Sequence, residues 1–214
     1  MFVGIELMKV YKYKSLGDTN CILGREKQLS YLKDIYENHR FYASEYNVLD
    51  DPMEGIFESY YGVESDIVQK IVKRKANIRI CSLSPTFRSM LMWSFYANCH
   101  KGYCVEAEID DNKLIKVSYD DNPIIIELQN ASEEDKIKML LSRKYKDWAF
   151  EKELRVLCKE SYVDITVSKI YFGMRVEDSL FQQLKAEIET KNKNIYVDKM
   201  KENMFEHINT SDEK

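Results

Sequence analysis

The sequence predicts an α+β fold: a single domain whose mixed, mostly antiparallel sheet is flanked by helices. Two observations lead to this prediction. Predicted strands occur partly as neighbours and partly with helices between them, which differs from the strict alternation of a doubly wound parallel sheet. The seven glycines and three prolines do not gather into a linker. We therefore expect one domain over residues 1–208 and a polar, disordered tail over residues 209–214.

Residues 79–108 make the unit around which we expect the rest of the chain to be organised. Residues 79–84 have the β-branched and apolar content of a strand, which Pro85 ends. Residues 90–97 place apolar side chains at helical spacing, and residues 103–109 alternate as a strand does. Strand, helix and strand in this short stretch form a compact frame on which a site can be built.

The other elements follow from the same two periodicities. Strands are expected at residues 10–14, 40–44, 114–119, 123–128, 151–158, 167–172 and 194–197, and helices at about 22–38, 63–76, 133–145 and 177–191. The strands 114–119 and 123–128 are expected to pair as a hairpin. Ser132 is expected to cap the helix that follows it. In the helix 63–76, we expect Ile67, Ile71 and Val72 to face the core and Lys70, Lys73, Arg74 and Lys75 to face solvent.

Length and composition indicate a reduced, cytoplasmic protein. The chain has 214 residues, 44% of them hydrophobic, enough for a sizeable core, and its net charge of −4 disfavours a general nucleic-acid binder. The amino terminus lacks the pattern of a signal peptide, and no apolar run is long enough to span a bilayer. The five cysteines form no C-x-x-C pair, and they lack zinc-site spacing with the histidines. We therefore expect free thiols, no zinc and no membrane partner.

Glu151 and Glu153 are the candidate catalytic residues. If residues 151–158 are a strand, Glu151, Glu153 and Arg155 share one face of it. Two carboxylates at this spacing can divide the work, one orienting a nucleophile and the other stabilising positive charge in the transition state. Taken alone, the residues favour a simpler interpretation, a surface ion pair between Glu151 and Arg155.

His100 is the most informative of the three histidines. It follows the 90–97 helix, and it can hold a substrate or act as an acid or base. A basic residue at a helix C-terminus, with Gly102 free to adopt positive φ, explains it equally well. Asp50, Asp51 and Glu54 offer carboxylates for a cation, but Asp-Asp-Pro favours a turn, which we expect here. The sequence has no dinucleotide-binding glycine motif, P-loop, nucleophile elbow or H-E-x-x-H motif.

Several segments, in order along most of the chain, resemble the bacterial domain-of-unknown-function family 2971. The segments that match its motifs are residues 11–16, 41–44, 50–54, 80–84, 92–97, 100–106, 144–155 and 170–175. The combination is specific, although Asp50 stands where the family has Asn and Phe95 where it has His. Members are often associated with phage defence and other conflict systems, so the resemblance implies a defence or toxin role.

The order of these segments is also similar to that of the ADP-ribosyltransferase fold, an architectural similarity. It implies that the chain binds NAD as a substrate, cleaves the nicotinamide–ribose bond and transfers ADP-ribose to a protein or nucleic-acid acceptor. In this scheme Glu153 stabilises an oxocarbenium-like transition state and Glu151 orients the acceptor. The NAD-binding residues implied by the similarity are Lys12, Tyr13, Ser82, Ser84, Trp93, Tyr96 and His100.

Two other classes of function stay open. A metal-dependent nuclease would use Asp50, Asp51, Glu54 and Glu153 around a cation, with the basic residues 70–75 on backbone phosphates. A non-catalytic binding or regulatory module is consistent with the absence of the family's histidine at Phe95. Turnover of NAD without metal separates the first class from the nuclease, and a ligand bound without turnover supports the binding module.

Overall fold

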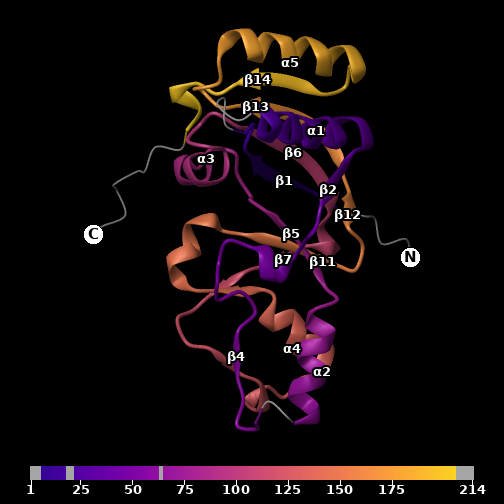
Figure 1. Cartoon of the computed structure of the whole chain (residues 1–214), viewed down its shortest axis with the longest axis vertical. Coiled ribbons are helices and arrows are strands. Elements are labelled where there is room, and N and C mark those ends of the chain that lie inside the picture. The colour runs from indigo at the N-terminus through magenta and orange to yellow at the C-terminus, as the bar shows by residue number, and fades with distance from the viewer. Residues whose placement is uncertain (1–5, 18–21, 63–64, 206–214) are drawn as a thin grey trace. The chain divides into compact units, whose positions relative to one another are not determined.

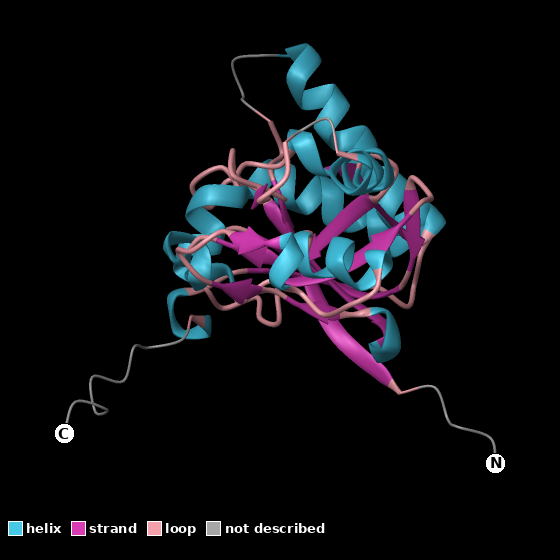
Figure 2. Cartoon of the chain, turned by 90° about the horizontal axis from the view of Figure 1, so that it is seen from below, coloured by secondary structure: helices cyan, strands magenta, loops and turns pink. Residues whose placement is uncertain are grey.

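The computed structural model describes residues 6–17, 22–62 and 65–205, and it confirms the α+β prediction (Figures 1 and 2). Its sheets combine antiparallel pairings, which predominate, with parallel ones. Figure 2 shows helices, strands and loops following one another along the described chain. The expected tail, residues 209–214, lies outside the described residues.

The chain divides into two compact units, each built from segments that are far apart in the sequence. The first unit contains Met1–Leu7, Phe41–Leu83 and Asp110–Asp164, and the second contains Met8–Arg40, Ser84–Ile109 and Ile165–Lys214, as far as these are described. The segments of the two units alternate along the chain. No single position therefore separates two consecutive domains within the expected domain, residues 1–208.

The second unit is built on a four-stranded sheet in the order β1-β6-β13-β14. Its strands are β1 (Leu7–Lys14), β6 (Tyr103–Asp110), β13 (Thr166–Phe172) and β14 (Tyr196–Lys199). Strand β13 is antiparallel to β6 and parallel to β14. Val10, Val105, Ile170 and Val197, one from each strand, are fully buried, so an apolar core crosses the whole sheet.

Two long helices belong to the same unit, α1 (Ile22–Asn38) and α5 (Asp178–Lys191). Both agree with the predicted ranges. Phe181, Leu184 and Ile188 of α5 are buried at helical spacing, and α5 runs beside β14 (Figure 1). The short parallel pairing of β14 with β13 is possible because the α5 connection carries the chain back between them.

Helix α3 (Met90–Tyr96) ends in a different way from the one the sequence predicted. Asn98, Cys99 and His100 have positive φ values of 47°, 51° and 68°, whereas Gly102 does not. Gly102 is required for space instead, because a Cβ there would lie 2.2 Å from the backbone oxygen of Lys14. The expectation that Gly102 provides the left-handed residue is therefore wrong, and three non-glycine residues make the turn.

The first unit contains a four-stranded sheet in the order β3-β5-β11-β7. Its strands are β3 (Ser44–Glu45), β5 (Arg79–Leu83), β11 (Leu154–Cys158) and β7 (Ile115–Lys116). Strands β5 and β11 are antiparallel and pair over five residues, with Arg155 opposite Ser82. Beside them, α2 (Asp66–Lys75) and α4 (Glu133–Leu140) pack together around Ile71, Ile80 and Leu140.

The expected hairpin over residues 114–128 is wrong. Strand β7 pairs with β11, β8 (Ser118–Tyr119) with β10 (Arg143–Lys144), and β9 (Ile124–Ile125) with β4 (Phe57–Glu58). Strands β7, β8 and β9 have two residues each, and their partners are distant in sequence, so neither periodicity nor a local turn identifies the pairing. The remaining elements are β2 (Arg40–Tyr42), β12 (Tyr162–Asp164), η1 (Tyr46–Val48), η2 (Asp111–Lys113), η3 (Ile126–Leu128), η4 (Lys146–Glu151) and η5 (Glu202–Met204).

The two helices of the first unit correct and confirm particular predictions. In α2, Ile71 is buried as expected, but Val72 is exposed and Lys75 is buried. The Lys75 ammonium donates to the Gly55 carbonyl at 2.6 Å and lies over the Tyr46 ring, which satisfies its charge inside the unit. In α4, Ser132 accepts from the backbone N–H of Asp135, which confirms the cap, but the helix ends at Leu140.

Four cysteines, Cys81, Cys99, Cys104 and Cys158, are free thiols, and the fifth, Cys21, lies outside the described residues. Within the described ranges, none of the helices combines the length and the apolar character needed to cross a membrane.

Trp93→Ala is expected to lower the free energy of unfolding by about 3 to 5 kcal/mol. Trp93 is fully buried, its indole N–H donates to the Phe87 carbonyl at 2.7 Å, and its ring packs against Tyr13. Leu91→Ala, on the same helix but 48% exposed, is the matched control and should change little. Urea denaturation measures both variants. Equal stability of the two would contradict the packing of α3.

Candidate functional site

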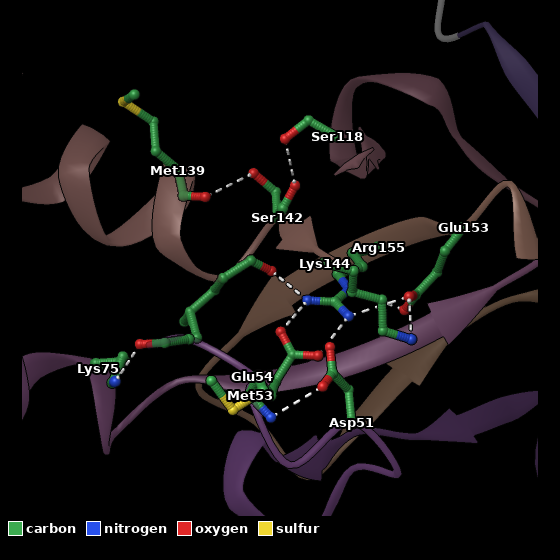
Figure 3. A network of polar contacts seen from close by, with 12 residues as sticks. Asp51, Met53, Glu54, Lys75, Ser118, Met139, Ser142, Lys144, Glu153 and Arg155 are labelled. Atoms are coloured by element: carbon green, nitrogen blue, oxygen red, sulfur yellow. Dashed lines mark hydrogen bonds and ion pairs between the residues drawn. The ribbon is translucent and has the colours of Figure 1, made fainter. Parts of the chain in front are cut away.

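A buried cluster of charged side chains lies in the first unit (Figure 3). This charged cluster consists of Glu54, Lys144, Glu151, Glu153 and Arg155, and none of the five residues is more than 7% exposed. The Lys144 ammonium lies 2.5 Å from a Glu151 oxygen and 3.1 Å from a Glu153 oxygen. It also lies 4.9 Å from the centre of the Trp148 ring. The two candidate catalytic carboxylates thus meet at one cation.

All five N–H groups of Arg155 donate hydrogen bonds, four of them to carboxylates of the cluster. Its Nη1 donates to Glu54 at 2.6 Å and to the Leu141 carbonyl at 2.7 Å. Its Nη2 donates to Glu54 at 2.8 Å and to Glu153 at 3.0 Å, and its Nε donates to Glu153 at 2.8 Å. A guanidinium has five donors, so its hydrogen-bonding capacity is fully used. Arg155 therefore holds both carboxylates in fixed, bidentate positions.

The elements that place Glu151 and Glu153 differ from the prediction. Residues 151–158 were expected to form one strand, but Glu151 ends the 3-10 helix η4, and β11 begins only at Leu154. Between the two carboxylates, Lys152 adopts a left-handed conformation with φ of 47°. The expected alternation along a strand therefore does not bring Glu151 and Glu153 together. A tight turn and the shared contact with Lys144 do so.

The cluster keeps Glu153 ionised. Burial alone would raise the pKa of Glu153, but the charge and hydrogen bonds of Arg155, the charge of Lys144 and a hydrogen bond from Ser82 lower it to about 2. Burial likewise lowers the pKa of Lys144, and the charges of Glu153 and Glu151 more than reverse this. The pKa of Glu54 is raised, because burial outweighs the hydrogen bonds and charge of Arg155, which lower it.

Three carboxylates in the cluster face two cations in direct contact with them. Glu54, Glu151 and Glu153 carry three negative charges when ionised, whereas Arg155 and Lys144 carry two positive ones. The five residues of the cluster, all ionised, carry one surplus negative charge, and the buried Lys75 ammonium acts electrostatically on Glu54. A cavity of about 20 Å³ beside Lys144 has room for about one water molecule.

The acidic loop before Glu54 is a turn, as expected. The backbone N–H of Met53 bonds to a carboxylate oxygen of Asp51 at 2.9 Å, and the backbone N–H of Glu54 bonds to the Asp51 carbonyl. The place between Glu54 and Glu153 is taken by the Arg155 guanidinium. Across the described residues, no group of three or more histidine, cysteine or acidic side chains is arranged to hold a metal ion.

Of the residues implied to bind NAD, only Ser82 lies in the same unit as the carboxylates; Lys12, Tyr13, Ser84, Trp93, Tyr96 and His100 belong to the second unit. Several of them have packing or hydrogen-bonding roles there. The Tyr13 hydroxyl donates to the Thr86 carbonyl at 2.8 Å, and the Ser84 hydroxyl donates to the same carbonyl at 3.1 Å. Trp93 is fully buried, whereas Lys12 and Tyr96 are half-buried.

His100 is buried against aromatic rings in the second unit. Its ring stacks on Trp93 and meets Phe205 edge to face. Its Nε2 lies 3.5 Å from the Ser94 hydroxyl, while its Nδ1 is buried without a hydrogen-bonding partner among the described residues. Burial, with the nearby charge of Arg175, lowers the pKa of His100. The ring is therefore held neutral at pH 7.

Sequence analysis missed a buried carboxylate outside the charged cluster, Glu106 on β6. It accepts hydrogen bonds from the Ser168 hydroxyl at 2.9 Å and from the Tyr11 hydroxyl at 3.2 Å, and Lys9 lies 3.5 Å away. The alternation of residues 103–109 suggested one polar face containing Glu106. Both faces of β6 are in fact buried from Tyr103 to Ala107, and alternation alone does not reveal this.

Comparisons with protein-family models, with characterised proteins and with solved structures gave no match to this chain. The resemblance to family 2971 and the similarity to the ADP-ribosyltransferase fold therefore stay proposals.

The charged cluster predicts a loss of stability in acid that depends on Glu153. The pKa of Glu153 is about 2 in the folded protein against an ordinary value of 4.5, so the unfolded chain binds the proton more readily. The stabilisation is present above pH 4.5 and is lost as the pH falls toward 2. The difference amounts to on the order of 3 kcal/mol.

Unfolding free energies of wild type and Glu153→Gln, measured by denaturant titration between pH 6 and pH 2, test this contribution. The variant should show a shallower fall over that range because the titrating group is gone. Parallel pH profiles for the two proteins would mean that Glu153 is not held as an anion by Arg155 and Lys144.

Proposed function

We propose that this protein binds NAD and cleaves the nicotinamide–ribose bond, as an ADP-ribosyltransferase-like enzyme with Glu153 as its central carboxylate. The observation that carries the proposal is an ionised Glu153 with Ser82 hydrogen-bonded to it from the neighbouring strand. The similarity of segment order implied a serine strand and a late Glu-x-Glu segment. In the first unit, the strand with Ser82 and the strand that follows Glu153 are direct neighbours.

The charge of the cluster suits the reaction. When the bond between the ribose C1′ and the nicotinamide nitrogen breaks, the nitrogen keeps the electron pair and neutral nicotinamide leaves. Positive charge develops on the ribose, and a preorganised anion stabilises it more than water does. The ionised carboxylate of Glu153 provides that anion. Lys144 and Arg155 hold this carboxylate in position.

In this proposal Glu151 orients the acceptor and takes its proton. One of its oxygens contacts Lys144 at 2.5 Å, next to Glu153 on the same ammonium. A carboxylate in this position can accept a hydrogen bond from an acceptor hydroxyl or from water, and take its proton as the bond to C1′ forms. The acceptor is water, a protein side chain or a nucleic acid. A role in phage defence or as a toxin is part of the same proposal.

Access to Glu153 requires the cluster to open. Its side chain is 4% exposed, and the cavity beside Lys144 is too small for a dinucleotide. Binding of NAD at Glu153 must therefore move groups that now cover it. Trp148, whose ring lies under the Lys144 ammonium, is half-buried and is one of only two tryptophans in the chain. Its fluorescence should report the change.

The metal-dependent nuclease has less support. Its proposed ligands Glu54 and Glu153 both bind the guanidinium of Arg155, whose five donors already fill the space between them. Lys75, assigned there to phosphate contact, is buried on Gly55. A non-catalytic module is the stronger rival, since every carboxylate of the cluster already has a partner.

Glu153→Gln is expected to lower the rate of nicotinamide release from NAD by about 100-fold or more, because the amide keeps the shape but loses the charge. Glu151→Gln should impair transfer to an acceptor more than hydrolysis. Nicotinamide release is measured by chromatography, with melting curves beside it, at a temperature where each variant is folded.

A separate measurement of NAD binding distinguishes a loss of catalysis from a folding defect. NAD should quench the fluorescence of wild type and of Trp93→Phe but not that of Trp148→Phe, if it binds beside Lys144. Wild type that neither releases nicotinamide nor binds NAD would remove the enzyme assignment, and the binding module would replace it.

A further inference from the structure

The backbone of Glu153 is held at both of its polar groups by one short segment of the first unit. The Val117 N–H donates to the Glu153 carbonyl at 3.0 Å. The Glu153 N–H in turn donates to the side-chain hydroxyl of Tyr119 at 2.8 Å. The position of this carboxylate therefore depends on Tyr119 as well as on its ion pairs with Arg155 and Lys144.

The hydroxyl of Tyr119 completes the turn between the two candidate catalytic carboxylates. The 3-10 helix η4 ends where the Lys152 N–H bonds to the Ala149 carbonyl at 3.2 Å. Lys152 adopts its left-handed conformation there, which costs free energy for a residue other than glycine. The next N–H, that of Glu153, leaves the helix and needs another acceptor. Tyr119 supplies this acceptor, so it stabilises the turn that brings Glu151 and Glu153 to one ammonium.

Strand pairing places the same tyrosine beside Lys144. Strands β8 and β10 are parallel, with Tyr119 opposite Lys144 in the register. The Asp120 N–H donates to the Lys144 carbonyl at 3.0 Å, which extends this pairing, and β8 also contacts η4. The ammonium that contacts both carboxylates and the hydroxyl that holds the turn between them therefore come from neighbouring positions of one strand pair.

The Tyr119 hydroxyl keeps its hydrogen at neutral pH and can donate it. Burial and the charges of Glu153 and Glu151 raise the pKa of Tyr119 to about 12, against the hydrogen bond from the Glu153 N–H and the charge of Arg155. A phenol oxygen can accept one hydrogen bond while its O–H donates another. Among the described residues, the oxygen accepts from the Glu153 N–H and the O–H has no acceptor. Tyr119 is half-buried, so it offers a neutral donor next to two buried anions.

We propose that Tyr119 is a further residue of this site and donates its O–H to the acceptor of ADP-ribose, which is therefore an oxygen nucleophile, water or a hydroxyl group. This inference rests on the proposed cleavage of NAD. It gives Tyr119 two tasks. Its oxygen positions Glu153 through the backbone N–H, and its hydrogen orients the acceptor beside Glu151.

The donor determines the chemical class of the acceptor. A hydroxyl oxygen has two lone pairs, so it can accept from Tyr119 with one and attack the ribose C1′ with the other. The C1′–O bond forms, the hydroxyl proton goes to Glu151, and the bond from C1′ to nicotinamide breaks with its electron pair on the nitrogen. A guanidinium or an ammonium has donors only and cannot accept from Tyr119. Arginine and lysine side chains are therefore unsuited as acceptors here.

The choice of acceptor is tested first on the wild-type protein. NAD is supplied in water that contains methanol, a small hydroxyl probe, or agmatine, whose guanidinium represents an arginine side chain. Chromatography separates the products. Wild type should release nicotinamide and give ADP-ribose, its methyl glycoside or both, but no agmatine adduct. Formation of an agmatine adduct would overturn the assignment of an oxygen nucleophile.

Tyr119→Phe then tests the residue itself. It should lower kcat for nicotinamide release by about 10-fold or more and change the KM for NAD little, because the hydroxyl acts on the acceptor and on the position of Glu153. Tyr145→Phe, at another half-buried tyrosine of the first unit, is the matched control and should behave as wild type.

Hydrogen exchange followed by NMR separates this role from a folding defect. In Tyr119→Phe the Glu153 amide should exchange about tenfold faster because it loses its acceptor, while amides in the pairing of β5 with β11 should not change. Faster exchange throughout the first unit would make Tyr119 a structural residue and overturn its assignment to the site. Nicotinamide release at the wild-type kcat by Tyr119→Phe would overturn this inference alone. Wild type that releases no nicotinamide would overturn the proposed function together with it.

Discussion

The fully saturated guanidinium of Arg155 is the interaction on which the first unit depends. It lies on β11, yet its partners come from the loop at Glu54, from Glu153 and from the Leu141 carbonyl after α4. Glu54 and Arg155 are separated by 101 residues in sequence. Replacing a buried ion pair by apolar groups is often neutral or stabilising, so stability is a poor explanation for the cluster. Its effect is to fix where loop, helix end and strand meet.

The contacts that position Glu153 also limit what it can do. Arg155 and Lys144 keep Glu153 ionised, but each also forms an ion pair that partly neutralises its negative charge. Under the proposed function, the charge that Glu153 offers depends on these two cations as well as on Glu153 itself. Lys144 contacts two carboxylates and the Trp148 ring, whereas Arg155 has no unused donor.

The parts of the fold that were predicted correctly are those with a local cause. Helix α5 and its buried Leu184 follow from helical spacing, and the Ser132 cap follows from the residue itself. The features that were predicted wrongly have non-local causes. Two-residue strands such as β8 pair with distant segments, and Lys75 is buried because the Gly55 carbonyl and the Tyr46 ring happen to face it. The carboxylate pair was found from its spacing, but for the wrong reason, since no strand joins its members.

The charged cluster has little hydrogen-bonding capacity left, and this determines what ligand binding there requires. In the charged cluster every donor of Arg155 is used, so a ligand there must replace contacts that already exist, and its binding includes the free energy of breaking them. The cluster therefore has to rearrange before a ligand binds, and only a ligand that brings compensating positive charge can replace the contacts that are broken.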